Sequence, residues 1–399
     1  MTATAENLSS ALEMEKVASH LHPEGSYDVS AHTAPTGREE IWRFTPLKRL
    51  RGLASDATFA PSATATTWNA PGGVRVESVT GDEAKALRGI SGLVPNTLFG
   101  ARVLAEVPDT LLVDMPAETE LDAPVIIDLD GKDAQVVEAG HVALRFGAHS
   151  RATVVLNHTG SATMAQVVEV KVGDGAQVSV VSLQDWADDA AHLTHHQAVV
   201  GRDASYKHVA ISFGGDVVRM DCNVTYDGPG GEVELLGLYF ADEGQHIEHR
   251  LFADHNAPRT KSHVTYKGAL QGKGAHTVWV GNVLIRKVAE GIETYEENRN
   301  LVLTDGCTAD SVPNLEIETG EIEGAGHAST VGRFDDEQLF YLRSRGIAED
   351  EAHRLVVHGF FNDLIRKFNV PELEEKLLAT VEGELAKNVL GANASNEGV

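Results

Sequence analysis

Cysteine is scarce in this sequence. Only Cys222 and Cys307 occur among 399 residues. Two cysteines are too few for a disulfide framework, or for a metal or iron–sulfur site with four cysteine ligands in one chain. A cluster held by this chain would therefore need ligands from a second chain.

Positive charge is also in deficit, because 33 Lys and Arg residues stand against 59 Asp and Glu, a formal net charge of −26. Nucleic acids and anionic membranes favour clustered Lys and Arg, so we expect neither as a partner. No apolar run approaches membrane-spanning length, and "MTATAENLSSALEMEKVASHLH" has acidic residues where a signal peptide needs a basic start. The sequence predicts a cytoplasmic protein.

A phosphate-binding loop is missing too. The Gly-rich turns "GGDVVRM" and "GPGGEVE" lack the lysine of the G-x-x-x-x-G-K-[ST] motif. We also single out no group of carboxylates with a basic residue that would form a catalytic groove. We therefore expect no enzyme activity, and an energy source would have to be a partner.

The first region, residues 1–107, mixes helical patterns with irregular segments. Its stretch "AENLSSALEMEKVASHL" has apolar residues at approximately helical spacing. In "AHTAPTGREEIWRFTPLKRLRGL", two prolines bracket Trp42 and Phe44 and exclude one continuous helix. We predict an extended arm with aromatic anchors there.

Residues 108–334 change to short apolar alternations cut by Gly, Asp, Asn and His, which is typical of strands. Four of them, "SRATVVL", "AQVSVVS", "ASYKHVAIS" and "GEVELLGLYF", begin at residues 150, 176, 204 and 231, so their offsets are 26, 28 and 27 residues. A nearly constant period with β units indicates a solenoid. We therefore predict a parallel β-helix core, with a two-sheet sandwich as the alternative, because turn signals every 8 to 12 residues or so would also fit one.

From residue 335 the apolar period changes to that of helices, which predicts a helical C-terminal domain over 335–399. Helices are expected at about 336–345, 349–368 and 371–391. Helices appended to a β solenoid can both cap it and offer a docking surface. The apolar stripe of the second helix comprises Leu355, Phe361, Leu364, Ile365 and Phe368.

Three blocks of the sequence resemble the SufB/SufD family of iron–sulfur cluster scaffold proteins. "PTGREEIWRFTPL" is similar to the family's N-terminal signature, and the stretch from Gln245 to Gly306 resembles its His-Asn-Ala-Pro, Tyr-Lys-Gly and Asn-Arg-Asn-Leu region. "HASTVGRFDDEQLFYLRSRGI" resembles the C-terminal junction, and its "YLRSRGI" is closer to the SufD branch than to SufB. The resemblance implies a mainly β fold with a right-handed parallel β-helix flanked by N-terminal and C-terminal helical regions.

The resemblance also implies a non-catalytic scaffold. SufD-type chains pair with SufB through their β-helices, and the C-terminal helices of each bind a copy of SufC, an ABC-type ATPase. The implied complex holds one SufD, one SufB and two SufC, receives persulfide sulfur through SufB and builds a nascent iron–sulfur cluster. Iron or that cluster, transiently bound, is the only cofactor implied.

His327 is the leading candidate for an iron or cluster ligand. A lone histidine is by itself a weak signal, but the resemblance implies that this one lies at the SufB–SufD interface. Neutral imidazole suits iron, and a strand end at a subunit seam can combine with a thiolate of the partner. Some relatives carry a cysteine two residues earlier, where this chain has Ala325.

The two cysteines are weaker candidates. Cys307, in "LTDGCTADSVP", could be a soft ligand or a persulfide carrier, but we favour a small turn residue because SufD-type relatives do not generally depend on a cysteine there. Asn298 stands nearest to the position of SufB's essential sulfur acceptor, which implies that this chain is not the primary acceptor. Cys222 alternates with apolar residues and is predicted to be interior.

Histidine clusters suggest a metal site as a less favoured hypothesis. In "HLTHHQAVV", His192 and His196 share one face of a strand and His195 points away. We therefore favour stacked polar positions in the β-helix over a zinc site. A second cluster, in "QHIEHRLFADH", comprises His246, His249 and His255.

Two carboxylates at strand spacing, Glu316 and Glu318, lie on one face. They could serve iron delivery. An exposed acidic edge that prevents strand aggregation is the interpretation that we favour.

Phe360 and Phe361, with the polar face around Arg354, Asn362 and Arg366, are the candidates for docking of the ATPase. A stripe of this kind usually belongs to a core. We expect one face of the helix to cover the solenoid and the other to meet the partner.

The sequence thus favours a scaffold subunit that acts with SufB-like and SufC-like partners. A homodimer that holds a cluster without SufB is one alternative. The other is a polysaccharide-active enzyme, because β-helices also host such activities.

Overall fold

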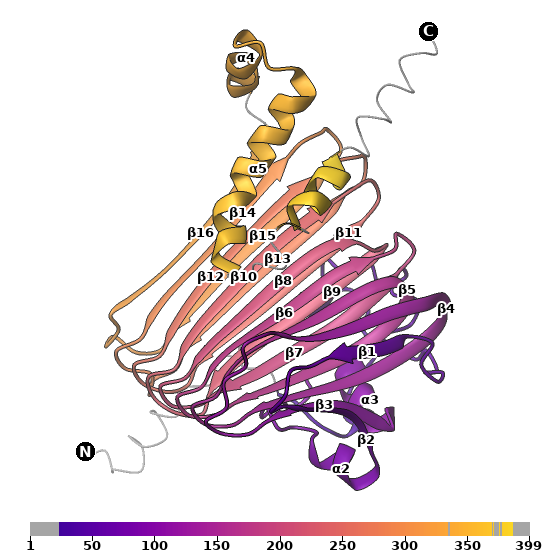
Figure 1. Ribbon diagram of the computed structural model, residues 1–399, viewed down its shortest axis with the longest axis vertical. Coiled ribbons are helices and arrows are strands. Elements are labelled where there is room, and N and C mark those ends of the chain that lie inside the picture. The colour runs from indigo at the N-terminus through magenta and orange to yellow at the C-terminus, as the bar shows by residue number, and fades with distance from the viewer. Residues whose placement is uncertain (1–23, 334–335, 369, 371–374, 376, 386–399) are drawn as a thin grey trace, which may run out of the picture.

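The computed structural model describes residues 24–333, 336–368, 370, 375 and 377–385. Its body is a mainly β solenoid whose successive coils hydrogen-bond in parallel, with helices near both ends of the chain (Figure 1). The predicted parallel β-helix core is therefore confirmed. The sandwich alternative is wrong, because neighbouring strands of the core come from successive coils and run parallel. The helix expected near residues 5–21 lies outside the described residues.

Each coil adds one strand to each of two sheets. The even-strand sheet contains the first halves of β4 and β5, then β6, β8, β10, β12, β14 and β16. The odd-strand sheet contains β3, the second halves of β4 and β5, then β7, β9, β11, β13 and β15. The bounds are β3 Asp109–Met115, β4 Val125–Phe146, β5 Arg151–Val172, β6 Gln177–Trp186, β7 Ala191–Val200, β8 Ser205–Gly214, β9 Val217–Tyr226, β10 Glu232–Ala241, β11 His246–His255, β12 Lys261–Leu270, β13 His276–Ile285, β14 Glu293–Val302, β15 Thr308–Ile317 and β16 Gly324–Arg333.

The strand register follows the sequence repeat. Arg151 pairs with Gln177, and Gln177 pairs with Ser205. Ser205 pairs in turn with Glu232, so the predicted offsets of 26, 28 and 27 residues are confirmed. Between β12 and β14 the offset reaches 32 residues, from 261 to 293, while both strands keep ten residues. The added residues therefore lie in the corners of the coils.

The interior between the sheets is packed by tyrosines placed against glycines. On the paired strands β10 and β12, Gly237 is opposite Tyr266, and Tyr239 is opposite Gly268. A Cβ added at Gly268 would lie 1.9 Å from the Tyr239 ring, and one at Gly237 would lie 2.0 Å from the Tyr266 ring. Only glycine leaves room for these two fully buried rings.

Six buried histidines also belong to the interior of the solenoid. Desolvation lowers the pKa of His158, His208 and His255 to about 4 each, so these rings are neutral at pH 7. They are held by hydrogen bonds, such as the 3.1 Å contact between His208 Nε2 and His196 Nδ1. The six are His158, His192, His196, His208, His249 and His255.

Segments before the solenoid cover the outer face of the odd-strand sheet. The short helix η2 (Glu40–Trp42) and the helix α3 (Leu98–Glu106) place Trp42 and Phe99 in a shared cluster with Val167 and Leu193 of the sheet. Buried parallel sheets need both faces covered, which explains why these strands are apolar on both sides. The arm was predicted to be extended, but it forms the short helix η2 and a run of turns. Its predicted aromatic anchor is confirmed at Trp42, which is buried.

Two strands in this region were not anticipated. β1 (Ala65–Asn69) pairs antiparallel with β4, and β2 (Arg75–Thr80) pairs antiparallel with β3. Short helices flank them, η1 (Val29–Ala31) and α2 (Gly81–Ala86). β1 is exposed along its length, so its sequence lacks the alternation that reveals a strand.

Part of the C-terminal helical region covers the outer face of the even-strand sheet. α5 (Glu349–Phe368) lies across that sheet, and α4 (Asp336–Ser344) stands clear of it (Figure 1). Residues 377–385, the described part of the last predicted helix, are helical. Phe361 and Leu364 pack with Leu236 and Leu238 of the sheet. Leu355 was wrongly placed in the apolar stripe, because it is exposed.

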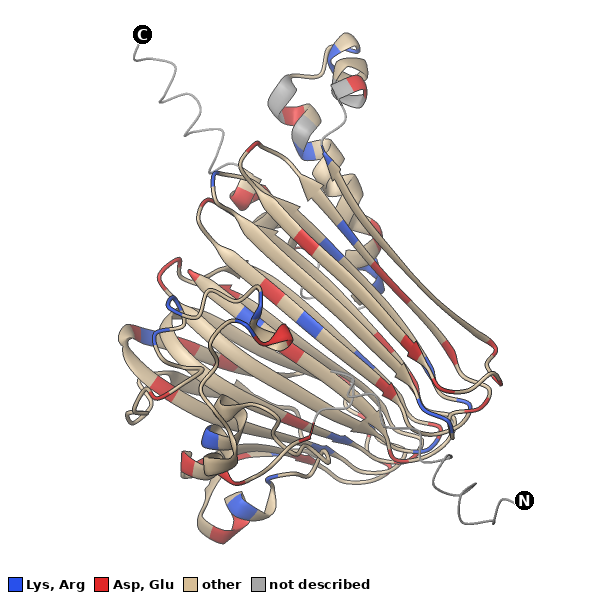
Figure 2. Cartoon of the chain, turned by 180° about the vertical axis from the view of Figure 1, so that it is seen from behind, with Lys and Arg blue, Asp and Glu red and all other residues tan. Residues whose placement is uncertain are grey.

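Charge is dispersed over the molecule. Acidic and basic residues are scattered over the strands, corners and helices on the face shown in Figure 2. In the parts that the structure describes, no helix is long and apolar enough to cross a membrane.

Candidate functional site

The last coil leaves one end of the solenoid uncovered. Among the described strands, β15 hydrogen-bonds only to β13, and β16 only to β14. Ile317 and Val331 belong to inward-facing rows, yet they are 46% and 51% exposed because no described coil covers them. Two unpaired strand edges with apolar side chains between them are typical of a surface that binds another chain.

The predicted ligand His327 lies at this open end. It is on β16, paired with Glu296 of β14, and its side chain is 43% exposed. Its Nδ1 atom is 3.8 Å from Oε1 of Glu296, whose own side chain is only 1% exposed. Desolvation raises the pKa of Glu296 to about 8. The sequence analysis did not anticipate Glu296, because "TYEENRN" resembles a solvated charged run. Alternate residues of a strand share a face, and this alternation could have placed Glu296 on the inward face with Asn298.

Asn298 lies two residues further along β14 and is completely buried. Its amide nitrogen donates to the Tyr239 hydroxyl at 2.8 Å. Its carbonyl oxygen accepts from Asn300 at 2.6 Å and from Ser311 at 2.7 Å. The amide therefore joins both sheets at the last coil, a structural role that a thiol could not supply.

Neither cysteine lies beside His327. Cys307 is in the corner after β14, where its thiol donates to the Gly272 carbonyl at 3.2 Å. His327 is paired with Glu296, and Cys307 follows the far end of the same strand at Val302. The strand spans roughly 20 Å between Glu296 and Val302. Cys222 is interior as predicted, and desolvation raises the pKa of its thiol to about 12, so it is not a thiolate at neutral pH.

The predicted acidic edge and histidine clusters assemble no metal centre. The described residues contain no group of three or more His, Cys, Asp or Glu that could hold an ion. His192 Nδ1 contacts Gln184 at 2.6 Å inside the solenoid, whereas His195 faces outward to Asn223 at 3.0 Å. Glu316 is the last residue but one of β15, and Glu318 lies just beyond the strand, where it accepts from the backbone amide of Lys287 at 3.2 Å.

The docking candidates divide between two faces of α5. Phe361 is completely buried against the even-strand sheet. Phe360 is partly buried, and the ammonium nitrogen of Lys267 lies over its ring, 5.1 Å from the ring centroid. Lys267 also donates to the Phe360 carbonyl at 2.7 Å. Arg354 and Arg366 are exposed on the remaining surface. Asn362 is exposed as well, and Arg354 is paired with Glu351 at 2.9 Å. The polar candidates, rather than the two phenylalanines, are therefore accessible to a partner.

An exposed aromatic pair on α4 was missed from the sequence. Phe340 is 75% exposed and Tyr341 57% exposed. Arg345 lies over the Tyr341 ring at 5.1 Å. Adjacent aromatic residues cannot both face one side of a helix, so "FYLRSRGI" carried a signal for exposure. These side chains extend the surface offered by Arg354.

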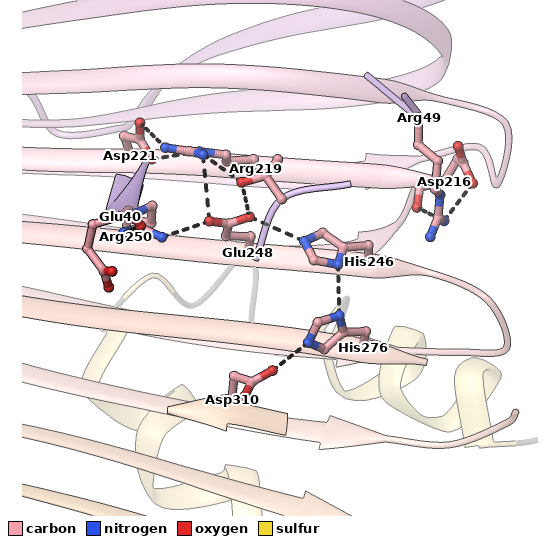
Figure 3. A network of polar contacts seen from close by, with 11 residues as sticks. Glu40, Arg49, Asp216, Arg219, Asp221, His246, Glu248, Arg250, His276 and Asp310 are labelled. Carbon is pink, nitrogen blue, oxygen red and sulfur yellow. Dashed lines mark hydrogen bonds and ion pairs between the residues drawn. The ribbon is translucent and has the colours of Figure 1, made fainter. Parts of the chain in front are cut away.

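A polar network crosses the outer face of the odd-strand sheet (Figure 3). Its centre is the buried Glu248, which accepts from Thr45 at 2.8 Å and from Arg250 at 3.1 Å, with Arg219 at 3.7 Å. Desolvation acts to raise the pKa of Glu248, but the charge of Arg219 and the hydrogen bond from His246 outweigh it and hold that pKa well below its usual value. The N-terminal arm is thus attached to the sheet through a buried charge.

The network continues to the edge strand β15. The Nδ1 atoms of His246 and His276 are 3.2 Å apart, and His276 Nε2 donates to Asp310 at 2.7 Å (Figure 3). His246 Nε2 faces Glu248 at 3.3 Å. The contact between the two rings needs a hydrogen on one of the two Nδ1 atoms, and the other Nδ1 atom then accepts it. The arm and the open end of the solenoid are linked by one set of contacts.

A charged groove of about 690 Å³ lies beside the end of α5. Its carboxylates are matched with lysines on neighbouring strands: Lys207 is 2.8 Å from Glu234, and Lys261 is 3.6 Å from Glu232. Such pairs form a ladder along the sheet. They do not leave a carboxylate free for glycoside chemistry at those positions.

Comparison with known families identifies the solenoid. The model described as "SUF system FeS cluster assembly, SufBD core domain" matches residues 129–360. The chain belongs to the SufBD family. Its SufBD core thus runs from β4 to the middle of α5, and includes both strands of the open end.

Mycobacterial relatives extend the match beyond the SufBD core. An iron–sulfur cluster assembly SufBD family protein of Mycobacterium bovis is 51% identical over 366 residues, 90% of this chain and 91% of the relative. One of Mycobacterium leprae is 49% identical over 366 residues, 90% of this chain and 93% of the relative. A second SufBD family protein of Mycobacterium leprae is 31% identical over 201 residues, only 23% of its own length. That bacterium therefore has at least two different SufBD proteins.

Proposed function

We propose that this chain is the SufD-type scaffold subunit of a cytoplasmic SUF complex. It pairs through its open end with a SufB-type chain and binds SufC-type ATPases through its C-terminal helices. It catalyses no reaction itself. Iron or the nascent cluster is cargo, held at the seam between the two scaffold chains with His327 as one ligand.

The observation that carries this proposal is the uncovered last coil. β15 and β16 present backbone edges, inward-facing apolar side chains and His327 on one surface. A second SufBD solenoid, ending in the same kind of strands, is the partner whose edges fit such a surface. The presence of two different SufBD proteins in Mycobacterium leprae supports a heterodimer over a homodimer.

The ATPase contact is assigned to α4 and the exposed face of α5. Phe340, Tyr341 and Arg354 provide aromatic and cationic groups, which are frequent at the centres of protein interfaces. Because α5 is packed on the even-strand sheet, a movement of the ATPase would be transmitted to the solenoid and to its open end.

The decisive measurement is the mass, by light scattering, of this chain co-expressed with the SufB-like and SufC-like proteins of its host. A complex containing all three supports the proposal. A chain that remains alone, or forms only homodimers, contradicts it. Val331→Arg on the edge strand should abolish pairing with the SufB-like chain, whereas Val94→Arg, at an equally exposed valine of the N-terminal region, should not.

The role of His327 is tested separately. His327→Ala should leave the complex assembled and reduce the yield of iron–sulfur cluster. An unchanged yield would remove His327 from the mechanism while leaving the scaffold role intact.

A further inference from the structure

Glu296 is a buried acidic side chain without hydrogen bonds. It lies inside the last complete coil, and neither carboxyl oxygen has a hydrogen-bond partner among the described residues. Other buried carboxylates of this chain are well satisfied, since Glu138 accepts from Thr64 and Glu169 accepts from Ser91. A buried polar group left without a partner costs free energy, so such an exception calls for a ligand.

The nearest group able to share a ligand with Glu296 is His327. The two residues are paired on adjacent strands and face inward, with Nδ1 and Oε1 3.8 Å apart. This separation is too long for a hydrogen bond. It fits two donors of one metal ion, because nitrogen and oxygen ligands at about 2.0 to 2.2 Å from an ion lie at most about 4.4 Å apart.

The opposite sheet is shaped to admit the carboxyl group. A Cβ added at Gly281 of β13 would lie 2.4 Å from Glu296 Oε2 and 2.4 Å from the ring of Trp279. Glycine at this position therefore makes room for the acid, and the indole ring forms an apolar wall beside it. His327, at 43% exposure, leaves the other side open to the seam.

We propose that Glu296 and His327 form half of a binding site for a divalent first-row metal ion. Carboxylate and imidazole together suit such ions, and ferrous iron is the ion that the proposed function, on which this choice rests, would supply. Water completes the coordination in the chain alone, and ligands from the partner complete it in the complex. The ion therefore binds weakly to this chain and more tightly after pairing.

The test is a titration of the untagged full-length chain with Co²⁺ alone, followed by its visible absorption. We expect saturable binding of one ion with a dissociation constant below about 1 mM. Glu296→Gln and His327→Ala should each weaken binding at least about tenfold, a loss of about 1.4 kcal/mol. Glu297→Gln is the matched control, because Glu297 lies next on the strand but faces outward and pairs with Arg299 at 2.6 Å.

The melting temperature of each metal-free variant serves as the control for correct folding. Glu296→Asp, which keeps a carboxylate, should retain more Co²⁺ binding than Glu296→Gln. Binding that survives Glu296→Gln would overturn the half-site, as would a wild-type chain that binds no Co²⁺ in this range.

The outcomes also separate this site from the proposed function. Co²⁺ binding that depends on Glu296, in a chain that forms no complex, would support the site and contradict the scaffold assignment. A stable complex, together with Co²⁺ binding to this chain that Glu296→Gln does not weaken, would support the scaffold assignment and contradict the site.

Discussion

The guanidinium group of Arg219 lies over the indole ring of Trp42, with its central carbon 3.9 Å from the ring centroid. Arg219 also donates to Thr45 at 2.7 Å. Both partners belong to the N-terminal arm, while Arg219 belongs to β9 of the solenoid. A cation on an aromatic face contributes most where water is excluded, and here both side chains are buried. The arm is therefore part of the folded core.

Trp42→Ala should lower the free energy of unfolding by about 3 to 5 kcal/mol, because it removes a buried aromatic side chain and its contact with Arg219. Urea denaturation provides the measurement. The same substitution at the exposed Trp68 of β1 should cost no more than about 1 kcal/mol. Equal losses at the two positions would mean that the arm is not anchored through Trp42.

Glu248→Gln should destabilise the protein by about 3 to 5 kcal/mol at pH 7, because it leaves Arg219 and Arg250 without their shared buried carboxylate. The folded-state pKa of Glu248 is depressed. Its contribution to stability is therefore present above the unfolded pKa of about 4.5 and lost as the pH falls toward the folded value. The difference between wild type and variant, measured in urea at several pH values, should shrink below about pH 4.5. A difference independent of pH would contradict this account.

The interior histidines should make the fold sensitive to mild acid. Burial lowers the pKa of His158, His208 and His255 to about 4, against about 6.5 in the unfolded chain. The unfolded state binds more protons between these values, so stability falls as the pH drops from about 6.5 to 4. The slope is up to about 1.4 kcal/mol per pH unit for each ring.

Urea denaturation between pH 7.5 and pH 5, which run from about one unit above the unfolded pKa to about one unit above the folded pKa, measures this slope. His208→Gln should reduce this slope by the contribution of one ring, up to about 1.4 kcal/mol per pH unit. His263→Gln is the control, because that side chain is exposed and keeps its contact with water on folding. A flat profile would mean that the interior rings are hydrated.

Gly268→Ala should cost about 1 to 3 kcal/mol through overpacking, since the new methyl group would overlap the Tyr239 ring. Gly140→Ala in β4 is the matched control, because nothing lies within 4 Å of a Cβ added there. Thermal unfolding of the two variants gives the comparison. Equal melting temperatures would show that Tyr239 can move without cost.

Substitutions on the two faces of α5 should have different effects, one on stability and the other on partner binding. Phe361→Ala removes a completely buried side chain between the helix and the even-strand sheet. It should cost about 3 to 5 kcal/mol of stability. Arg354→Glu removes only an exposed ion pair with Glu351, so it should change the melting temperature little. It should weaken binding of the SufC-like ATPase, measured by co-purification. Retained binding would shift the contact from α5 to the aromatic pair of α4.

Much of the architecture could be read from the sequence. The offsets between strands and the alternation along each strand predicted a parallel solenoid with Cys222 inside, and the structure confirms both. The strands β1 and β2 could not be found in this way, because β1 is exposed along its length and gives no alternation. Leu355 was misplaced because helical spacing does not reveal how wide the packed face is.

The repeat follows from the sequence alone, and with it the pairing of the strands and the side chains that share a face. A period of two residues and a coil length are local properties of the chain. The packing of distant segments has a different consequence: Glu296 is buried with no hydrogen-bond partner among the described residues, while its neighbour Glu297 is paired at the surface. The same packing brings Trp42 onto Arg219. Burial and pairing depend on which distant coil or arm covers a residue, and no local pattern contains that.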